Sequence, residues 1–206
     1  MPVALPAHLS ASRLVELAAD PAAVALAVRR PVPTAPHPAA RRGTAFHAWL
    51  EERFRADTLV DLDDVPGASD EDDAADERLE QLQAAFLASE WAERTPLAVE
   101  VDLETLVAGL VVRCRVDAVF PARSGPSGAV DVVDWKSGAP PTGERARHAA
   151  VQLAVYRLAW SRLHGVPLQH VGAAFFYAAT GQTRRPADLL DEAGLEALVT
   201  GLPTAP

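Results

Sequence analysis

Cysteine is nearly absent from this sequence of 206 residues, which contains only Cys114. A single cysteine excludes a disulfide framework, a cysteine-rich zinc site and an iron–sulfur cluster held by four cysteines of this chain. No apolar run approaches the roughly 20 residues that cross a bilayer, and the first residues lack the basic start and long apolar stretch of a signal peptide. We therefore expect a cytoplasmic protein without a membrane partner.

Excess positive charge is also absent, since the formal net charge is −9. Residues 61–80 alone contain ten acidic residues and one arginine, and thus account for the whole excess. The other 18 acidic and 18 basic residues cancel. The charge is concentrated in one segment that we interpret as solvated, so it does not exclude a DNA-binding groove elsewhere.

Lysine is the scarcest charged residue. The 19 basic residues are 18 arginines and one lysine, Lys136. Lysine carries a compact point charge, whereas arginine carries a wide planar fork of donors. A single lysine in an arginine-rich chain indicates a position where arginine does not substitute, and it directs attention to the surrounding residues.

The hydrophobic spacing changes along the chain from a helical period to a strand period. Alternation predicts three strands in succession and one later strand, at residues 97–103, 109–120, 129–136 and 171–178. Helical spacing predicts the remaining elements, at residues 9–20, 21–29, 44–55, 76–93, 145–163 and 188–200, with Thr44 as a cap and a proline-rich connector at 31–38. This order predicts an α/β fold.

Asp134 and Lys136 are two residues apart on a predicted strand and therefore share a face. The acid can supply a hard oxygen ligand to Mg²⁺ or Mn²⁺, and the lysine can position water and offset phosphate charge. A plain surface ion pair explains the same spacing. In a hairpin register Asp117 approaches Asp134, and two close carboxylates repel unless a cation lies between them. Alternatively, Asp117 pairs with Arg115.

Other polar residues have both a functional and a structural interpretation. His47 lies on a predicted helix as a candidate ligand or a half-buried packing residue. Gln152 and Tyr156 share one helix face and form either a substrate contact or a polar helix edge. Glu100 is a candidate extra ligand or supporting acid, although strands also carry solvent-facing glutamates. By alternation, we expect Trp135 and Cys114 to be packing residues.

Four motifs occur in a recognisable order: Gly43-x-x-x-His47, Asp117 at a strand end, Asp134-x-Lys136-x-Gly138 and Gln152-x-x-x-Tyr156. This order resembles the RecB-like branch of the PD-(D/E)XK nuclease superfamily over about residues 9–178. The stretches RRGTAFHAWLE and VVDWKSG look similar to the C-terminal nuclease domain of actinobacterial AdnA/AdnB-type helicase–nucleases.

The resemblance implies a restriction-endonuclease-like core with a central mixed sheet flanked by helices. It places an N-terminal helical extension and connector at 1–40, and the nuclease core at 41–206 with an acidic insertion at about 57–78. It implies hydrolysis of single-stranded DNA, leaving 5′-phosphate and 3′-hydroxyl ends, in double-strand-break processing and recombinational repair.

The resemblance also assigns roles to individual residues. His47, Asp117, Asp134 and the backbone carbonyl of Trp135 match the ligands of Mg²⁺ or Mn²⁺, and no iron–sulfur cluster is expected. Lys136 matches the catalytic lysine, acting together with Asp134 and Asp117. Gln152 and Tyr156 match the residues that orient substrate. Apart from the resemblance, we expect Arg113, Arg115, Arg145 and Arg147 to contact the DNA backbone, which would make binding strongly salt dependent.

The sequence contains no Gly-x-x-x-x-Gly-Lys-Ser/Thr loop, so we do not expect this chain to hydrolyse ATP by that route. We therefore expect a helicase motor either fused in a longer chain or present as a partner subunit. Two alternatives remain open at this point. One is a DNA-guiding or partner-binding module that does not cut, and the other is a stand-alone nuclease of the same superfamily.

Overall fold

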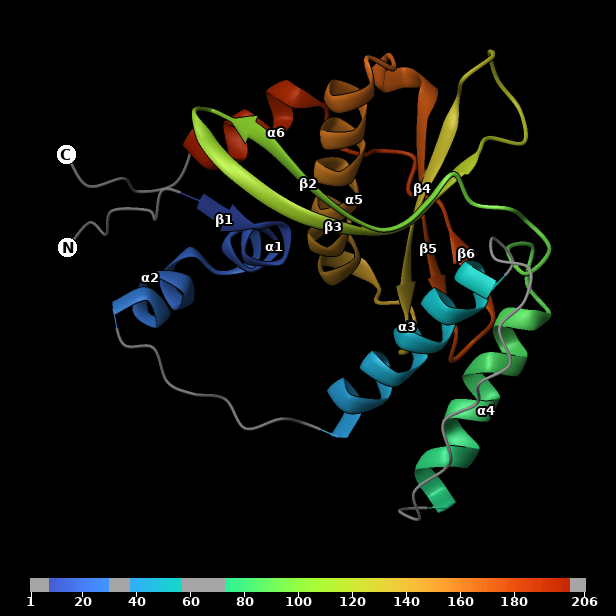
Figure 1. The fold of residues 1–206 in the computed structure, drawn as a ribbon. Coiled ribbons are helices and arrows are strands. Elements are labelled where there is room, and N and C mark those ends of the chain that lie inside the picture. Colours follow the sequence, from blue (N-terminus) through green and yellow to red (C-terminus); the bar gives the residue numbers. More distant parts are fainter. Residues whose placement is uncertain (1–7, 30–37, 57–72, 201–206) are drawn as a thin grey trace.

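A computed structural model describes residues 8–29, 38–56 and 73–200 (Figure 1). The described elements are, in chain order, β1 (His8–Ser10), α1 (Ala11–Ala19), α2 (Pro21–Arg29), α3 (Pro38–Ala56), α4 (Asp73–Leu87), β2 (Ala98–Val107), β3 (Leu110–Pro121), β4 (Val130–Lys136), α5 (Gly143–His164), a 3₁₀ turn (Leu168–His170), β5 (Val171–Tyr177), β6 (Gln182–Arg184) and α6 (Glu192–Thr200).

One mixed sheet joins all six strands in the order β1-β3-β4-β5-β6, with β2 antiparallel to β3. The β1–β3 and β4–β5 pairs are parallel, and the other pairs are antiparallel. Strand β2 follows one edge of β3 along most of its length. The other edge pairs with β1 at residues 111–113 and with β4 at residues 118–121, so the sheet splits between these two segments.

Two helical layers cover the sheet (Figure 1). On one face, α5 packs with α1 and α6 over an aliphatic core that includes Leu14, Leu153 and Leu195. On the other face, α3 and α4 pack over an aromatic core. Helix α5 ends at His164 and is capped by Gly165, which adopts the left-handed conformation (φ +65°) that glycine accommodates without strain. This arrangement confirms the predicted mixed sheet flanked by helices.

The longer predicted elements are present, and the differences lie at their ends. Helix α3 begins at Pro38, so Thr44 lies inside the helix and its prediction as a cap is wrong. Helix α4 ends at Leu87 instead of residue 93, because turns follow in which the backbone N–H groups of Ser89 and Arg94 donate to carbonyls three residues earlier. Strands β1 and β6 were not predicted.

The first described residues contribute to the main core, since Leu9, Leu14, Leu17 and Val24 are buried against it. The division of the chain near residue 40 stays a prediction. Residues 31–37 of the predicted connector (31–38) and residues 57–72 of the predicted acidic insertion (about 57–78) lie outside the described residues, and the remaining residues 73–78 belong to α4. Within the described part of the chain, no helix combines the length and the apolar character needed to cross a membrane.

Candidate active site

Asp117 and Asp134 lie where β3 and β4 diverge. The last pair of the β3–β4 ladder on this side joins Ala118 to Val133, so Asp117 and Asp134 occupy the next opposed positions. Both are buried, with exposed fractions of 7% and 1%. Trp135, which alternates with Asp134 along the strand, packs in the aromatic core. Packing of this residue therefore directs its two neighbours to the opposite face.

The environment of Asp117 disfavours a free charge on its carboxylate. Burial raises the pKa of Asp117, and the negative charge of Asp134 raises it further. One hydrogen bond opposes this effect, because the backbone N–H of Trp135 donates to Asp117 Oδ2 at 2.7 Å. Two neighbouring buried carboxylates are stable when a proton or a cation compensates their charge.

His47 reaches this pair from α3. Its Nε2 lies 2.9 Å from the backbone oxygen of Trp135. A carbonyl only accepts hydrogen bonds, so Nε2 carries the proton in this contact. The other ring nitrogen, Nδ1, lies 3.7 Å from both Glu100 Oε1 and Asp117 Oδ1. Burial lowers the pKa of His47, but Glu100, Asp117 and Asp134 outweigh burial and raise it to about 8.

Glu100 completes the group from β2. Its backbone has φ +50°, in the left-handed region that a residue other than glycine seldom occupies. Its side chain is 12% exposed, with Oε1 toward His47 and Oε2 accepting from Arg115 at 2.5 Å. Burial raises the pKa of Glu100, but the contacts with His47 and Arg115 outweigh burial and lower it. Such backbone strain is typical of functional sites.

His47, Glu100 and Asp117 form a set of metal-ligand donors. One ligand atom from each lies within 4.8 Å of the others. One imidazole nitrogen and two carboxylate oxygens suit Mn²⁺ or Mg²⁺. Among the predicted ligands, the structure brings His47 and Asp117 into this set. Asp134 lies beside the set, and the Trp135 carbonyl faces Nε2 of the imidazole. Glu100, which received no role from the sequence motifs, supplies the third donor.

Lys136 belongs to a closed ring of polar contacts around Asp134. Its Nζ lies 2.6 Å from Asp134 Oδ2 and donates to Gln152 Oε1 at 3.1 Å. Gln152 Nε2 donates to the Tyr156 hydroxyl at 2.6 Å, and this hydroxyl donates to Asp134 Oδ1 at 3.3 Å. Burial and the neighbouring carboxylates raise the pKa of Tyr156, which keeps its proton. These contacts hold the Lys136 ammonium group beside Asp134, and the Lys136 side chain is 35% exposed.

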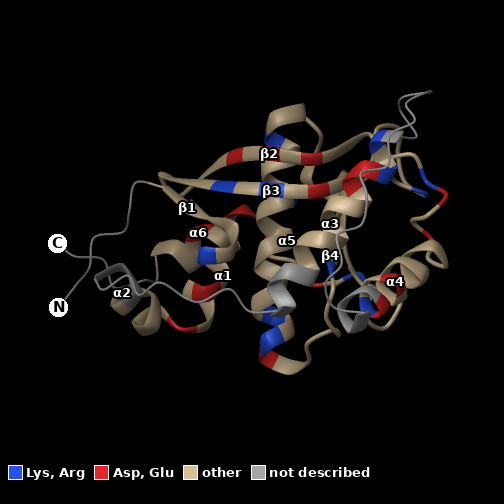
Figure 2. Ribbon diagram, turned by 60° about the horizontal axis from the view of Figure 1, so that its bottom comes forward, with Lys and Arg blue, Asp and Glu red and all other residues tan. Residues whose placement is uncertain are grey.

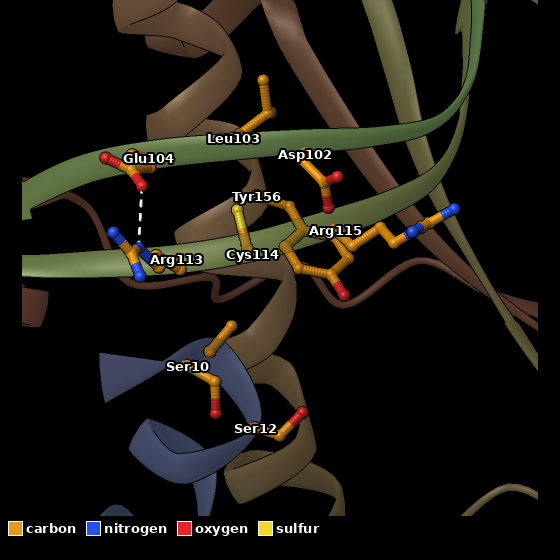
Figure 3. Close-up of a pocket in the computed structure, with 10 residues that line it drawn as sticks. Ser10, Ser12, Asp102, Leu103, Glu104, Arg113, Cys114, Arg115 and Tyr156 are labelled. Atoms are coloured by element: carbon orange, nitrogen blue, oxygen red, sulfur yellow. Dashed lines mark hydrogen bonds and ion pairs between the residues drawn. The ribbon is translucent and has the colours of Figure 1, made fainter. Parts of the chain in front are cut away.

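The two strand arginines expected to bind DNA are already paired. Arg113 donates to Glu104 at 2.8 Å, as Figure 3 shows, and Arg115 donates to Glu100 at 2.5 Å. Both residues line a cavity of about 490 Å³, and Ser10 and Tyr156 also line it. Because each guanidinium already has a carboxylate partner, a phosphate would have to compete for it.

A family model and one solved structure agree with this architecture. The family model described as the PD-(D/E)XK nuclease superfamily matches residues 8–200. No curated protein matches the chain. A crystal structure from Eubacterium rectale, named a "putative exonuclease", has a TM-score of 0.58 and 11% identity, and the match covers 95% of this chain and 77% of that one. The crystal structure of SSO0001 has a TM-score of 0.43 and 15% identity, covering 97% and 77% of the two chains.

Proposed function

Because this chain belongs to the PD-(D/E)XK nuclease superfamily, we propose that it is a metal-dependent deoxyribonuclease that hydrolyses phosphodiester bonds of single-stranded DNA. One observation carries the proposal. The donor set His47, Glu100 and Asp117 lies beside the ion pair between Lys136 and Asp134. The pair combines the chain's only lysine with a carboxylate that is 1% exposed. An exonuclease mode is supported by the name given to the Eubacterium rectale protein.

The reaction requires a nucleophilic water, a stabilised transition state and a stabilised leaving oxygen. A bound divalent cation lowers the pKa of water and polarises a phosphate oxygen. In this chain, His47 Nδ1, Glu100 and Asp117 would hold the cation. The water oxygen would bond to phosphorus and lose a proton to solvent, while the bond from phosphorus to the 3′ oxygen breaks and that oxygen takes up a proton from solvent, leaving a 3′-hydroxyl and a 5′-phosphate.

Lys136 provides a fixed positive charge for this step. Its ammonium group would orient the water and stabilise the negative charge that develops on the phosphate, and preorganised donors of this kind act without reorganising during the reaction. Gln152 restrains the ammonium group through its 3.1 Å contact, and Tyr156 in turn restrains Gln152. We keep Asp134 in the proposed ligand set, since it lies opposite Asp117 and raises the pKa of both Asp117 and His47. The Trp135 carbonyl stays a predicted ligand.

The cellular role that we propose is DNA-end processing within a helicase–nuclease involved in double-strand-break repair and recombination. The resemblance to AdnA/AdnB-type nuclease domains supports this role. The motor would belong to a longer chain or to a partner subunit. A module that guides DNA without cutting is the second candidate, but the close contact between Asp134 and Lys136 favours cleavage. A stand-alone nuclease has the same chemistry and differs only in its partner.

Substitution of the ion pair tests the proposed activity. We expect Lys136→Ala and Asp134→Asn each to reduce Mg²⁺- or Mn²⁺-dependent cleavage of a labelled single strand by about 10²-fold or more, the order of loss seen when one transition-state donor is removed. Asp131→Asn is the matched control, since Asp131 lies on the same strand and pairs with Arg94. Circular dichroism checks folding. Parent-level cleavage by a folded Lys136 or Asp134 variant would refute the proposed site.

A further inference from the structure

A second cavity, of about 880 Å³, opens beside Lys136 and is not used by the proposed chemistry. It lies between the first turns of α5, strands β5 and β6, and the segment before α6, and it belongs to the size class of ligand pockets, roughly 300–1,000 Å³. We call it the α5–β6 groove. Its lining includes Pro140, Pro141, Arg147, Phe175, Arg184 and Leu190.

The groove reaches the proposed active site through β5 and α5. Phe175 lines the groove, and its ring centroid lies 5.5 Å from Lys136 Nζ. Tyr177 also lines the groove and pairs in register with Lys136 across the β4–β5 ladder. On α5, the lining residue Val151 immediately precedes Gln152, which contacts Lys136. The groove therefore lies next to residues that contact or pair with the lysine.

Basic residues dominate the charge of the groove. Arg147, Arg184, Arg185 and His148 line it together with a single acid, Asp188. Figure 2 shows basic residues at the lower end of α5. Arg185 pairs with Glu90 at 2.9 Å, whereas among the described residues the one ion pair of Arg147 is a long contact of 3.7 Å with Glu144.

Arg184 is the most available of these cations. Its Nη2 donates to the neutral Gln182 side chain at 2.6 Å, and within the described part of the chain it has no carboxylate partner within 4.0 Å. In contrast, Arg113 and Arg115 each contact a glutamate at 2.8 Å or less. Arg147 and Arg184 thus have more capacity to bind a phosphate than the two strand arginines or Arg185.

The rest of the lining is largely apolar, with three prolines, several alanines and the exposed Leu190, while the rings of Phe175 and Tyr177 are nearly buried at its base. A suitable ligand therefore has anionic groups and flat apolar surfaces along one chain. Unpaired nucleotides have both, because arginines bind their phosphates and apolar or aromatic side chains pack against the bases. Duplex DNA would bring sugars, phosphates and base edges to this lining but not the flat base faces, because these are stacked inside.

We infer that the α5–β6 groove binds unpaired deoxynucleotides next to the phosphate that is cleaved. This inference deepens the proposed function and rests on it. It also gives a physical cause for the proposed preference for single strands, since the apolar lining would contact unpaired bases and the arginines would bind the phosphates. Arg147 and Arg184 are the phosphate-binding residues of the groove.

A binding assay without catalysis tests the groove. Anisotropy with a fluorescein-labelled oligo-dT strand, in EDTA, compares the parent with the double variant Arg147→Gln/Arg184→Gln. We expect the dissociation constant of the double variant to rise about tenfold or more, and the slope of log K against log salt to fall by about 1.4, or 0.7 for each lost phosphate contact. Arg123→Gln is the control, because Arg123 is exposed and lies in the turn before β4, at the strand end opposite Lys136.

The outcomes separate this inference from the proposed function. If the parent cuts neither single nor double strands with Mg²⁺ or Mn²⁺, the proposed nuclease activity is wrong. Binding of oligo-dT in EDTA does not require cleavage, so it still tests whether the groove binds DNA. If the double variant and Arg123→Gln bound oligo-dT with equal affinity, the inference that the groove binds DNA would be wrong. Equally tight binding of a duplex of the same length would overturn its single-strand preference, and tighter binding of oligo-rU would overturn the assignment to DNA.

Discussion

The role of Glu100 is an example of a property of a single residue that cannot be predicted from the sequence. Its position on a strand predicts either a ligand or a solvent-facing acid, because strands carry both. Two structural features distinguish them. The β2–β3 ladder pairs its neighbours Val99 and Val101 with the residues on either side of Asp117, and its left-handed backbone accompanies a side chain whose Oε1 lies 3.7 Å from His47 Nδ1. Neither the register nor the backbone angle can be derived from an alternating pattern of residues.

The role of Glu100 can be tested against a neighbour on the same strand. We expect Glu100→Gln to weaken Mn²⁺ binding, measured by isothermal titration calorimetry, by about tenfold or more, since loss of even an outer partner of a metal ligand costs about 10–100-fold. Glu104→Gln is the matched control, because Glu104 is 60% exposed and pairs with Arg113. Equal Mn²⁺ affinities of the two variants would remove Glu100 from the donor set.

Successive residues of strand β4 point to opposite faces of the sheet, so that Trp135 packs in the aromatic core while Asp134 and Lys136 face the proposed active site. Trp135 is 1% exposed, and its ring contacts Phe54, Phe86 and Trp91, from both helices of the α3–α4 layer and from the turns after α4. Its own backbone N–H and carbonyl contact Asp117 and His47. The aromatic core thus fixes the position of β4 and, with it, the orientation of Asp134 and Lys136.

Truncation of this ring tests the contribution of the aromatic core to stability. Trp135→Ala should lower the free energy of unfolding by about 3–5 kcal/mol, as expected for a large buried aromatic residue. Leu163→Ala, at a position 62% exposed on α5, should change it by about 0.5 kcal/mol or less. Urea unfolding followed by circular dichroism measures both. A loss below about 1 kcal/mol for Trp135→Ala would show that the cluster does not hold the strand.

The elements that the sequence predicts best are those with a sustained period. Helix α5 and strands β3 and β4 lie within two residues of their predicted bounds, and they carry Asp117, Asp134, Lys136, Gln152 and Tyr156. Strands β1 and β6 contain three residues each, too few for a period to emerge. They exist because β3 and β5 offer them unpaired edges, and this pairing is a long-range property of the fold.

Across the whole molecule, the donor set joins segments that are distant in sequence. Its three residues come from α3, β2 and β3, and Asp134 and Lys136 from β4 lie next to them. A cation held there would contact the helical layer and the sheet together, and it would bind only the folded chain. By linkage, such a ligand stabilises the native state in proportion to the logarithm of its concentration above the dissociation constant.

Thermal unfolding therefore reports the metal site without any nuclease assay. At 100 times its dissociation constant, Mn²⁺ should add about 2.7 kcal/mol of stability, which corresponds to a rise in Tm of roughly 5–11 °C for a chain of this size. Burial and Asp134 raise the pKa of Asp117, so a proton competes with the cation at lower pH, and the rise should be smaller at pH 6 than at pH 8. Excess EDTA should reverse the rise, and His47→Ala should reduce it while Glu104→Gln preserves it. An equal rise in the His47→Ala variant would place the bound ion outside the donor set, because that substitution removes the only nitrogen donor among its three residues.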